Sequence, residues 1–339
     1  MIQLALIGLG NMGKLHLNNL IKLNLNKICK LGCICDIDKD LTDKISNRIN
    51  VKGYYCVEDM IKDYKFDAAI ISITSSEHFK VAKLLIEHDK PILIEKPVVI
   101  SIDEAEELYR VSHEKNILVS PGYTEVYNSV TTGIKNYLKN CRNFNYIDFY
   151  RIGQKGKRNN TKDIDVIQDL MTHDLAVLSQ IIDLNKIKSI QGNVSSYNDK
   201  SKKYDLSNVS LFFENRSIAR FLCDRSSSVK IRKFNISNDE MYGEFDFMDQ
   251  TANIMKKGSI DAFGKDIWYS KNYDAVKIRY SNNPLYDEIK DFILSVENST
   301  ETKVSEKWFN ITRIIEYIRE TLYRDYKINT RSSDVYENK

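Results

Sequence analysis

The 339-residue sequence has no uncharged apolar stretch of about 18 residues, which is the shortest length typical of a helix that crosses a bilayer. Its N-terminus runs directly into a strand-like segment, without the basic region and small-residue cleavage site of a secretory signal. Neither sign of charge dominates, because 50 basic and 47 acidic residues leave a net charge of +3. We therefore expect a cytoplasmic protein that binds neither nucleic acid nor membranes.

Cysteine pairs typical of metal or redox sites are also missing. The six cysteines show neither Cys-x-x-Cys nor the Cys/His spacing of a zinc site, which predicts reduced, mostly buried thiols and no metal. They are Cys29, Cys33, Cys35, Cys56, Cys141 and Cys223. The sequence shows no internal repeat, and its length exceeds what one hydrophobic core comfortably serves, which indicates two domains.

The most informative motif is Gly8-Leu9-Gly10-Asn11-Met12-Gly13, which follows an apolar run and leads into a helix-like stretch, residues 14–22. In such a strand-turn-helix unit, Gly8 permits a tight turn, Gly10 lets the backbone approach a phosphate, and Gly13 lets helix and strand pack closely. The helix N-terminus then attracts a pyrophosphate. Glycine triplets also occur in ordinary turns, but the preceding β-rich run favours a dinucleotide site.

Asp36 ends the second β-prone segment, 28 positions after Gly8. A carboxylate at this place accepts hydrogen bonds from the adenosine ribose hydroxyls and repels a 2′-phosphate, so we expect NAD rather than NADP. Lys39 lies near enough to soften that preference. The alternative is that Asp36 belongs only to a turn or a helix cap.

The first 120 residues alternate apolar strands with helices, a pattern typical of a doubly wound parallel sheet covered on both faces. From Gly122 the pattern changes to short alternating strands, which predict a largely antiparallel, open sheet in an α+β domain. A helix is expected at 166–182 and two more at 285–296 and 306–323. The expected domains are a Rossmann domain at 1–121, a substrate and oligomerisation domain at 122–330 and a mobile polar tail at 331–339.

Glu95-Lys96-Pro97 stands at the end of a predicted parallel strand, where open α/β sheets place their ligands. A lysine that is partly desolvated in such a crevice has a lowered pKa and can exchange a proton with a substrate hydroxyl. Pro97 fixes the turn and favours an extended Lys96. Taken alone, a lysine at a strand end is more often a solvated surface charge.

Asp169 and His173 are spaced i, i+4 in a predicted helix, so both side chains lie on one face. The carboxylate can then raise the basicity of the imidazole, or both groups can grip one sugar. Asp174 adds a third polar group, whereas no nearby His or Cys completes a zinc site. A structural Asp/His contact is the alternative.

These four elements together resemble the glucose-fructose oxidoreductase and inositol dehydrogenase family of NAD(P)-dependent oxidoreductases. The resemblance runs from residue 2 to about residue 325 and includes His16 after the glycine motif and the loop Ser75-Ser76-Glu77-His78. It also includes residues 122–128 and 169–174.

The resemblance implies a Rossmann domain with a second α+β domain that builds homodimers or homotetramers. It implies that Lys96, His173 and Asp169 are catalytic, with Lys96 and His173 meeting across the nicotinamide of NAD. The cofactor-binding residues that it implies are Gly8, Leu9, Gly10, Asn11, Met12, Gly13, Asp36, Thr74, Ser75, His78, Glu95 and Lys96. The implied substrate-binding residues are Lys96, Tyr123, Arg151, Asp169 and His173.

Within the family, residues 150–153, the basic loop 155–158 and residues 163–169 look most like dehydrogenases that act at C3 of UDP-N-acetylglucosamine-like nucleotide sugars. A basic loop beside the site suits a diphosphate. Val126, Ser129 and Ala176 depart from the residues that relatives often carry. Two alternatives stay open: a dehydrogenase or reductase of an inositol or another small carbonyl compound, and a non-catalytic NAD-binding regulator, although a regulator would be expected to lose the lysine or the histidine.

Overall fold

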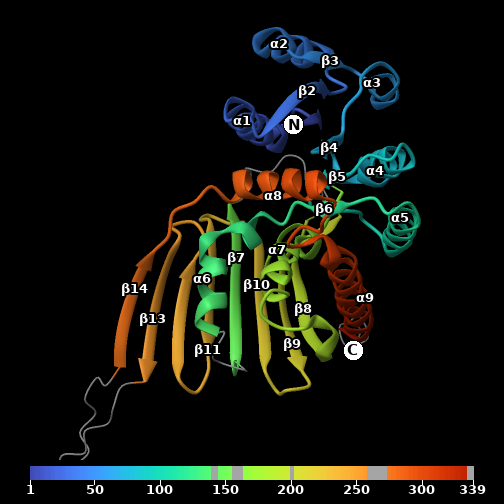
Figure 1. The fold of residues 1–339 in the computed structure, drawn as a ribbon. Coiled ribbons are helices and arrows are strands. Elements are labelled where there is room, and N and C mark those ends of the chain that lie inside the picture. Colours follow the sequence, from blue (N-terminus) through green and yellow to red (C-terminus); the bar gives the residue numbers. More distant parts are fainter. Residues whose placement is uncertain (139–143, 155–162, 199–201, 258–272, 334–339) are drawn as a thin grey trace, which may run out of the picture. The chain divides into compact units, whose positions relative to one another are not determined.

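The computed structural model describes residues 1–138, 144–154, 163–198, 202–257 and 273–333, which fall into two compact units (Figure 1). The N-terminal unit contains Met1–Tyr127, Asn160–Ile164 and Asn283–Tyr317. The C-terminal unit contains Asn128–Asn159, Asp165–Asn282 and Ile318–Lys339. The sequence alone predicts two consecutive domains with a boundary between residues 121 and 122. In the structure, residues 283–317 belong to the N-terminal unit as well.

The N-terminal unit is built on a six-stranded sheet in which every neighbouring pair is parallel. The strands are β1 (Ile2–Ile7), β2 (Cys29–Cys35), β3 (Lys52–Tyr54), β4 (Ala68–Ile71), β5 (Ile92–Ile94) and β6 (Val119–Pro121). Their order, β3-β2-β1-β4-β5-β6, changes direction between β1 and β4. In open parallel sheets that switch point leaves a ligand crevice at the carboxyl ends of the strands. The predicted doubly wound sheet is confirmed.

Helices flank this sheet, and short polar caps start several of them. Asp38 caps α2, Ser101 caps α5 and Asn283 caps α8, each by accepting a hydrogen bond from a backbone N–H in the first turn. The helices are α1 (Asn11–Leu25), α2 (Lys39–Ile49), α3 (Val57–Asp63), α4 (His78–Glu87), α5 (Ile102–Lys115) and α8 (Pro284–Asn298). Short 3₁₀ turns are η1 (Ser75–Glu77), η2 (Thr124–Tyr127) and η5 (Ser305–Lys307).

Helix α8 completes the hydrophobic core beneath β1, although it is distant in sequence. Its Ile289, Phe292 and Ile293 are fully buried in the cluster that also holds Leu4 and Leu6 of β1. Helices α1 and α8 contact each other and β1, so the two helices cover one face of the strand together.

Glu288 of α8 is a fully buried acid. One carboxyl oxygen accepts a hydrogen bond from Thr124 Oγ1 at 3.0 Å, and the other has no hydrogen-bond partner. Burial, followed by the negative charges of Glu95, Glu125 and Asp291, raises the pKa of Glu288 well above its ordinary value. The folded protein therefore keeps a proton here that the unfolded chain releases.

The wild type should lose stability as the pH rises, and replacement of Glu288 by glutamine should remove this loss. Because the folded-state pKa of Glu288 is raised, its contribution to stability is complete below the unfolded pKa of 4.5 and falls as pH rises toward the folded pKa. The free energy of unfolding of Glu288→Gln should therefore gain on the wild type by up to about 1.4 kcal/mol per pH unit above that value. Urea unfolding of both proteins across this range checks the slope. Parallel pH profiles for the two proteins would contradict the assignment of a neutral Glu288.

The C-terminal unit contains, in its described residues, an eight-stranded sheet. The strands are β7 (Tyr146–Gln154), β8 (Ile187–Asn198), β9 (Lys203–Phe213), β10 (Ile218–Ser227), β11 (Ile231–Ser237), β12 (Met241–Asp246), β13 (Thr251–Lys257) and β14 (Tyr273–Arg279). Their order is β14-β13-β12-β11-β7-β10-β9-β8, and only β7 and β10 among these strands pair in parallel. The predicted, largely antiparallel sheet is confirmed.

One face of this sheet carries a row of aromatic side chains and is covered by helices (Figure 1). Phe221, Phe149, Phe234 and Phe245 stand side by side on neighbouring strands, with ring centroids 4.6 to 5.5 Å apart. These rings are buried, and stacked or tilted pairs of this kind add to the burial of apolar area. The helical elements of the unit are α6 (Ser129–Leu138), η3 (Ile167–Met171), α7 (Thr172–Leu178), η4 (Leu184–Lys186) and the second part of α9 (Trp308–Ser333).

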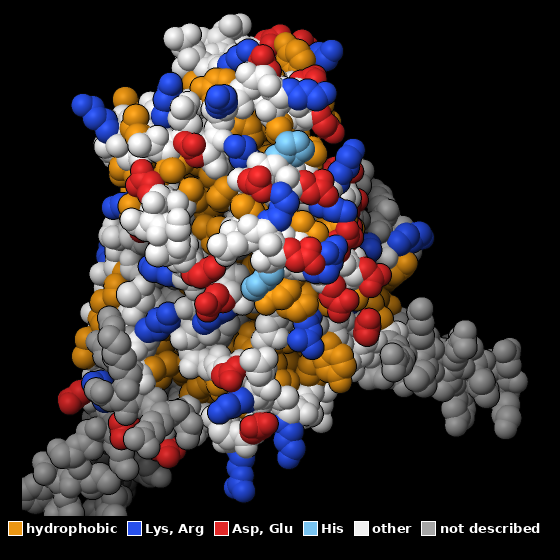
Figure 2. Space-filling view, turned by 45° about the vertical axis from the view of Figure 1, so that its right-hand side comes forward, with side chains coloured by type: hydrophobic (Ala, Val, Ile, Leu, Met, Phe, Trp, Pro, Cys, Tyr) orange, Lys and Arg blue, Asp and Glu red, His pale blue; other side chains and the backbone are white. Residues whose placement is uncertain are grey.

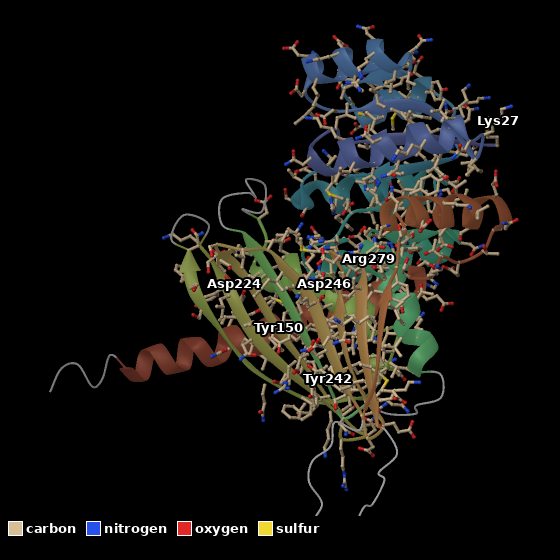
Figure 3. All side chains as sticks on the ribbon, turned by 90° about the vertical axis from the view of Figure 1, so that its left-hand side faces the viewer. Lys27, Tyr150, Asp224, Tyr242, Asp246 and Arg279 are labelled. Atoms are coloured by element: carbon tan, nitrogen blue, oxygen red, sulfur yellow. The ribbon has the colours of Figure 1, made fainter. Side chains whose placement is uncertain are left out.

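The opposite face of the sheet is open. Tyr150, Asp224, Tyr242 and Asp246 stand on it, each partly exposed, while the residue that precedes each of them in its strand is buried (Figure 3). On the view of the surface in Figure 2, basic and acidic side chains are interspersed.

The structure differs from the expected elements in several places. The expected helix at 166–182 is a π-helical turn, η3, followed by the short α7, and α9 continues to Ser333 rather than ending near residue 323. Strands β3 and β14 are not apparent from the sequence pattern because each is short or largely exposed. Among the described residues, no helix is both long and apolar enough to cross a membrane.

The described cysteines carry free thiols. Cys29, Cys33, Cys35 and Cys223 are buried and Cys56 is half-buried, which confirms the expected mostly buried thiols for the described positions. Burial raises the pKa of Cys33 and Cys35 to about 12, so these thiols are poor nucleophiles. Cys141 lies outside the described residues.

Candidate functional site

The glycine motif forms a tight turn between β1 and α1, at the switch point of the parallel sheet. Gly8 has a φ of +93°, and a Cβ at this position would lie 2.1 Å from the carbonyl oxygen of Ser72. A Cβ on Gly13 would lie 2.0 Å from the carbonyl oxygen of Gly8. Only glycine fits either position, as the sequence predicts.

Gly10 has a different environment. A Cβ there would meet no atom within 4 Å, and the residue is exposed as the N-cap of α1. No side chain caps this helix and its first turn holds no acidic residue. The N-terminal end of α1 is thus electrically uncompensated beside open space, which suits an incoming anion. Asn11 and Met12, the other predicted residues of the turn, are exposed at the start of α1.

Asp36 links the end of β2 to the glycine turn. Its Oδ2 accepts a hydrogen bond from the Leu9 N–H at 2.6 Å, and its Oδ1 accepts one from the Asp38 N–H at 2.9 Å. The second bond closes a local turn, which is the alternative role that the sequence suggests for Asp36. The N-cap of α2 is Asp38 rather than Asp36. Each carboxylate oxygen keeps a lone pair for a further donor, so these bonds are compatible with the predicted contact to a ribose. Lys39 lies over the ring of Tyr55, 5.3 Å from its centroid.

The loop after β4 lies beside the glycine turn. The hydroxyl of Ser72 is buried without a hydrogen-bond partner, 3.8 Å from where a Cβ on Gly13 would stand. Thr74 is exposed and Ser75 half-buried, both at the start of η1. A serine after a buried strand carries no distinctive signal, so the sequence could not have identified Ser72.

His78 is buried and bound by backbone. Its Nδ1 lies 2.7 Å from the carbonyl oxygen of Pro97, and its Nε2 lies 3.3 Å from that of Ile73. Burial lowers the pKa of His78, although these carbonyls oppose the shift, so the ring is neutral. The ring therefore ties the loop after β4 to the loop after β5.

Glu95 and Lys96 follow β5 at the same edge of the sheet. Glu95 is buried and its Oε1 lies 2.8 Å from Nε2 of the fully buried His16, while its Oε2 accepts a bond from the Lys96 N–H at 3.3 Å. Burial alone would raise the pKa of Glu95, but the hydrogen bond and charge of His16 outweigh it and lower the pKa. Lys96 is half-buried, and the Lys96-Pro97 peptide bond is cis.

Gly122 and Tyr123 pack behind this edge. A Cβ on Gly122 would lie 3.1 Å from Cα of Glu95, so this glycine permits the loop to approach β5 closely. Tyr123 is 1% exposed, and burial raises its pKa. Little of the Tyr123 surface is therefore exposed for the predicted contact with substrate.

The N-terminal unit fits a bound dinucleotide. The open space at Gly10, the uncompensated N-terminus of α1 and the buried, unpartnered hydroxyl of Ser72 lie at one edge of the sheet. Asp36 stands at the end of the neighbouring strand, where the ribose of such a ligand lies.

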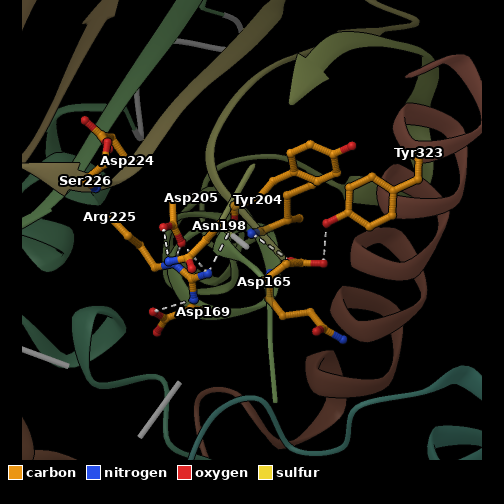
Figure 4. A network of polar contacts seen from close by, with 11 residues as sticks. Asp165, Asp169, Asn198, Tyr204, Asp205, Asp224, Arg225, Ser226 and Tyr323 are labelled. Atoms are coloured by element: carbon orange, nitrogen blue, oxygen red, sulfur yellow. Dashed lines mark hydrogen bonds and ion pairs between the residues drawn. The ribbon is translucent and has the colours of Figure 1, made fainter. Parts of the chain in front are cut away.

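In the C-terminal unit, Asp165 organises the turn that carries Asp169 (Figure 4). Asp165 is fully buried, and its Oδ1 accepts hydrogen bonds from the N–H groups of Ile167 and Gln168 at 2.9 and 3.0 Å. Its Oδ2 accepts bonds from Arg319 Nε at 2.6 Å and Tyr323 Oη at 2.5 Å. Sequence reasoning missed this residue, although an Asp just before a helical run is a recognisable cap signal.

Asp169 is buried within η3 and lies near an arginine from the sheet. Its Oδ2 is 3.7 Å from a guanidinium nitrogen of Arg225, and Arg225 also donates to Oδ1 of Asp205 at 2.8 and 3.1 Å (Figure 4). Asn198 donates to the other oxygen of Asp205 at 2.9 Å. No sequence signal distinguishes Arg225 from other strand arginines, so the sequence could not have identified it.

His173 lies one turn after Asp169 and is 9% exposed. The neighbouring Asp174 is paired with Arg151, whose Nε and a terminal nitrogen lie 2.8 and 2.7 Å from Oδ1 of Asp174. Arg151 is 1% exposed and its guanidinium lies 5.7 Å from the ring centroid of Phe247. The alternation along β7 turns the side chain of Arg151 toward the helix-covered face of the sheet, where it meets Asp174, and its direct contact with substrate stays a prediction.

Two expectations lie beyond these observations. The basic loop at 155–158 lies outside the described residues. Lys96 belongs to the N-terminal unit and His173 to the C-terminal unit, so their meeting across a nicotinamide stays a prediction. In the described part of the chain, no three His, Cys, Asp or Glu side chains gather as they would around a metal ion.

Comparison with protein families gives a match to the N-terminal unit. The model of the "Oxidoreductase family, NAD-binding Rossmann fold" matches residues 2–123. This stretch contains the glycine turn, Asp36 and Glu95-Lys96-Pro97.

Similar proteins cover nearly the whole chain. UDP-N-acetylglucosamine 3-dehydrogenase from Acidithiobacillus ferrooxidans is 23% identical over 293 residues, which are 86% of this chain and 87% of that protein. A solved structure of that enzyme has a TM-score of 0.82 at 18% identity and covers 95% of this chain and 97% of its own. The scyllo-inositol dehydrogenase from Lactobacillus casei, solved with NAD(H) and scyllo-inositol, has a TM-score of 0.76 at 16% identity, with 96% and 98% covered. At these identities the structural likeness shows the fold.

Proposed function

Residues 2–123 belong to the oxidoreductase family that has an NAD-binding Rossmann fold, and from this premise we propose that the protein is an NAD-dependent sugar dehydrogenase. It transfers a hydride between a secondary hydroxyl of a sugar or nucleotide sugar and NAD, and C3 of a UDP-N-acetylglucosamine-like substrate is the specific candidate. The observation that carries this proposal is the similarity to UDP-N-acetylglucosamine 3-dehydrogenase, because it extends over 86% of the chain and thus into both units.

NAD, when bound, accepts the hydride at its nicotinamide. In the proposal, the turn of Gly8, Gly10 and Gly13 holds the pyrophosphate at the N-terminus of α1. Asp36 accepts hydrogen bonds from the ribose hydroxyls, and its negative charge disfavours the 2′-phosphate of NADP. Leu9 supports this role by fixing the carboxylate through its N–H.

Lys96 and His173 take the acid-base roles in the proposed reaction. One accepts the proton of the reacting hydroxyl, and the other stabilises the developing carbonyl oxygen. Asp169 binds a neighbouring hydroxyl or orients His173. Arg151, which pairs with Asp174 beside His173, is a further substrate-binding residue in the proposal.

We also propose that the protein works in the cytoplasm as a homodimer or homotetramer. The free thiols of the described cysteines support a reducing compartment. The open face of the eight-stranded sheet, with Tyr150 and Tyr242, offers a surface for a second copy (Figure 3). The near-zero net charge and the interspersed charges in Figure 2 do not favour a nucleic acid or a membrane as partner.

A thermal-shift screen of nucleotide sugars, with NAD present, tests the substrate class. A ligand that binds only the folded protein stabilises it by about 2.7 kcal/mol at a concentration of 100 times its Kd, so a true substrate should raise the Tm by several degrees. The same sugar should produce NADH absorbance, and UDP alone should inhibit that reaction competitively. If the protein oxidises an inositol and UDP does not inhibit this reaction, the substrate is the inositol and not a nucleotide sugar. Tight NAD binding without turnover of any sugar would contradict the dehydrogenase itself.

A further inference from the structure

We infer that Asp165, Arg319 and Tyr323 are positioning residues for Asp169 and His173, so that the C-terminal helix α9 sets how the sugar-binding helix presents its two functional side chains. The inference rests on the proposed function for the roles of Asp169 and His173. The contacts that carry it lie entirely within the C-terminal unit (Figure 4).

The carboxylate of Asp165 connects two elements that are far apart in sequence. Oδ1 accepts the N–H groups of Ile167 and Gln168, which are the first residues of the π-helical turn η3. Oδ2 accepts Arg319 Nε and Tyr323 Oη, which stand one turn apart on α9. The residue is fully buried, so no solvent competes for these four hydrogen bonds.

Charge and packing favour the same arrangement. The single negative charge of Asp165 meets the positive charge of Arg319, whose side chain is 17% exposed. Burial and the adjacent Asp165 carboxylate raise the pKa of Tyr323, so its hydroxyl remains a donor. The ring of Tyr204 from β9 lies 5.3 Å from that of Tyr323, which holds this ring in place.

The turn fixed by Asp165 is the one that positions Asp169. The Asp169 N–H donates to the Asp165 carbonyl oxygen at 3.0 Å, so the backbone of Asp169 starts from the anchored residue. Its carboxylate lies 3.7 Å from the guanidinium of Arg225, which Asp205 holds in turn. Asp169 is therefore constrained through its backbone by α9 and through its side chain by the sheet. His173 follows on the same run of helix.

Such an anchor matters for catalysis because proton-transfer groups lose efficiency when they are misplaced by about 1 Å. The π-helical turn itself is a departure from regular helix geometry that recurs at functional sites. An unanchored chain would be free to return to α-helical spacing and rotate Asp169 relative to His173.

Three variants separate the anchor from general stability. Asp165→Asn keeps an oxygen for the N–H groups of Ile167 and Gln168 but removes the charge that Arg319 meets. Tyr323→Phe removes one hydroxyl and preserves the ring that packs on Tyr204. Tyr317→Phe is the matched control, since it makes the same change on the same helix at a side chain that is 61% exposed.

Steady-state kinetics with the sugar identified by the screen gives the first readout. In Asp165→Asn and Tyr323→Phe, kcat/KM for the sugar should fall about 10- to 100-fold, while the Kd for NAD and the kinetics of Tyr317→Phe stay at wild-type values. Arg319→Lys should retain more activity than Arg319→Gln, because it keeps the charge. A lowered Tm with unchanged kcat/KM would mean that the network is merely structural and would overturn the inference.

The NMR signal of the His173 imidazole gives a readout that needs no turnover. The protein has five histidines, and the His173 resonance is assigned by its loss in His173→Gln. Its chemical shift and titration midpoint should change in Tyr323→Phe and stay the same in Tyr317→Phe. If the wild type oxidises no sugar, the proposed function fails while this measurement still decides the inference. An unaltered His173 signal in a folded Tyr323→Phe protein would refute the inference. This test remains valid even if Asp165→Asn does not fold.

Discussion

Replacement of Lys96 by methionine should lower turnover at least about 100-fold, which is the low end for the loss of a positioned proton-transfer group. Methionine keeps the length and the apolar stem of the side chain but has no ammonium. Since the glycine turn and Asp36 hold the pyrophosphate and the ribose in the proposal, the Kd for NAD should stay near the wild-type value. Stopped NADH production with preserved NAD binding, measured by calorimetry, is the expected pair of results.

His173→Ala should reproduce this behaviour from the other unit, while Lys80→Met serves as control for Lys96→Met. Lys80 is an exposed lysine of the N-terminal unit, so its loss should leave turnover unchanged. Normal turnover in both Lys96→Met and His173→Ala would remove the two residues from the reaction. Loss of turnover together with loss of NAD binding would assign Lys96 to the cofactor alone.

Alanine substitutions in the glycine motif should divide into two classes. Gly13→Ala places a methyl group 2.0 Å from the Gly8 carbonyl oxygen, so the backbone must move and the folded turn is lost. Gly10→Ala meets no protein atom within 4 Å and has an ordinary φ of −65°. Its methyl group instead enters the space that we assign to the pyrophosphate. Both variants should therefore weaken NAD binding by at least about 100-fold, because the backbone of this motif approaches the pyrophosphate closely only where it carries no side chain.

Thermal unfolding without NAD tells the two causes apart. The Tm of Gly13→Ala should fall strongly, whereas that of Gly10→Ala should fall only slightly, because an alanine fits the backbone there and its change at an N-cap costs only about 1 kcal/mol. NAD should then raise the Tm of the wild type and fail to raise that of Gly10→Ala. A Gly10→Ala protein that binds NAD normally would show that the phosphates lie elsewhere.

The sequence predicts the N-terminal unit well because its signals are local. The strand, glycine turn and helix around Gly8 follow each other without interruption, as the sequence predicts. Apolar runs such as that of β4 indicate strands buried on both faces. Helix α8 was expected as a helix, but its packing beneath β1 is a tertiary property that its own sequence does not contain.

Several contacts of the candidate site join residues that are distant in the sequence, so local sequence signals do not predict them. The pairing of His16 with Glu95 joins residues 79 positions apart, and that of Asp165 with Tyr323 joins residues 158 apart. The pairing of Arg151 with Asp174 joins a strand to a helix, and neither segment of the sequence predicts it. The i, i+4 spacing of Asp169 and His173 predicts a regular α-helix, whereas the π-helical turn Ile167–Met171, which carries Asp169, could not be inferred from the residues.

The return of α8 to the N-terminal unit has a consequence for how the chain folds during synthesis. Leu4 and Leu6 emerge from the ribosome nearly 300 residues before the Ile289 and Phe292 that cover them. The nascent nucleotide-binding unit must wait, with one apolar surface uncovered, until almost the entire polypeptide has been made. A fragment that stops at Tyr127 keeps every strand of the six-stranded sheet yet lacks this cover, so completion of the cofactor-binding unit depends on the synthesis of α8.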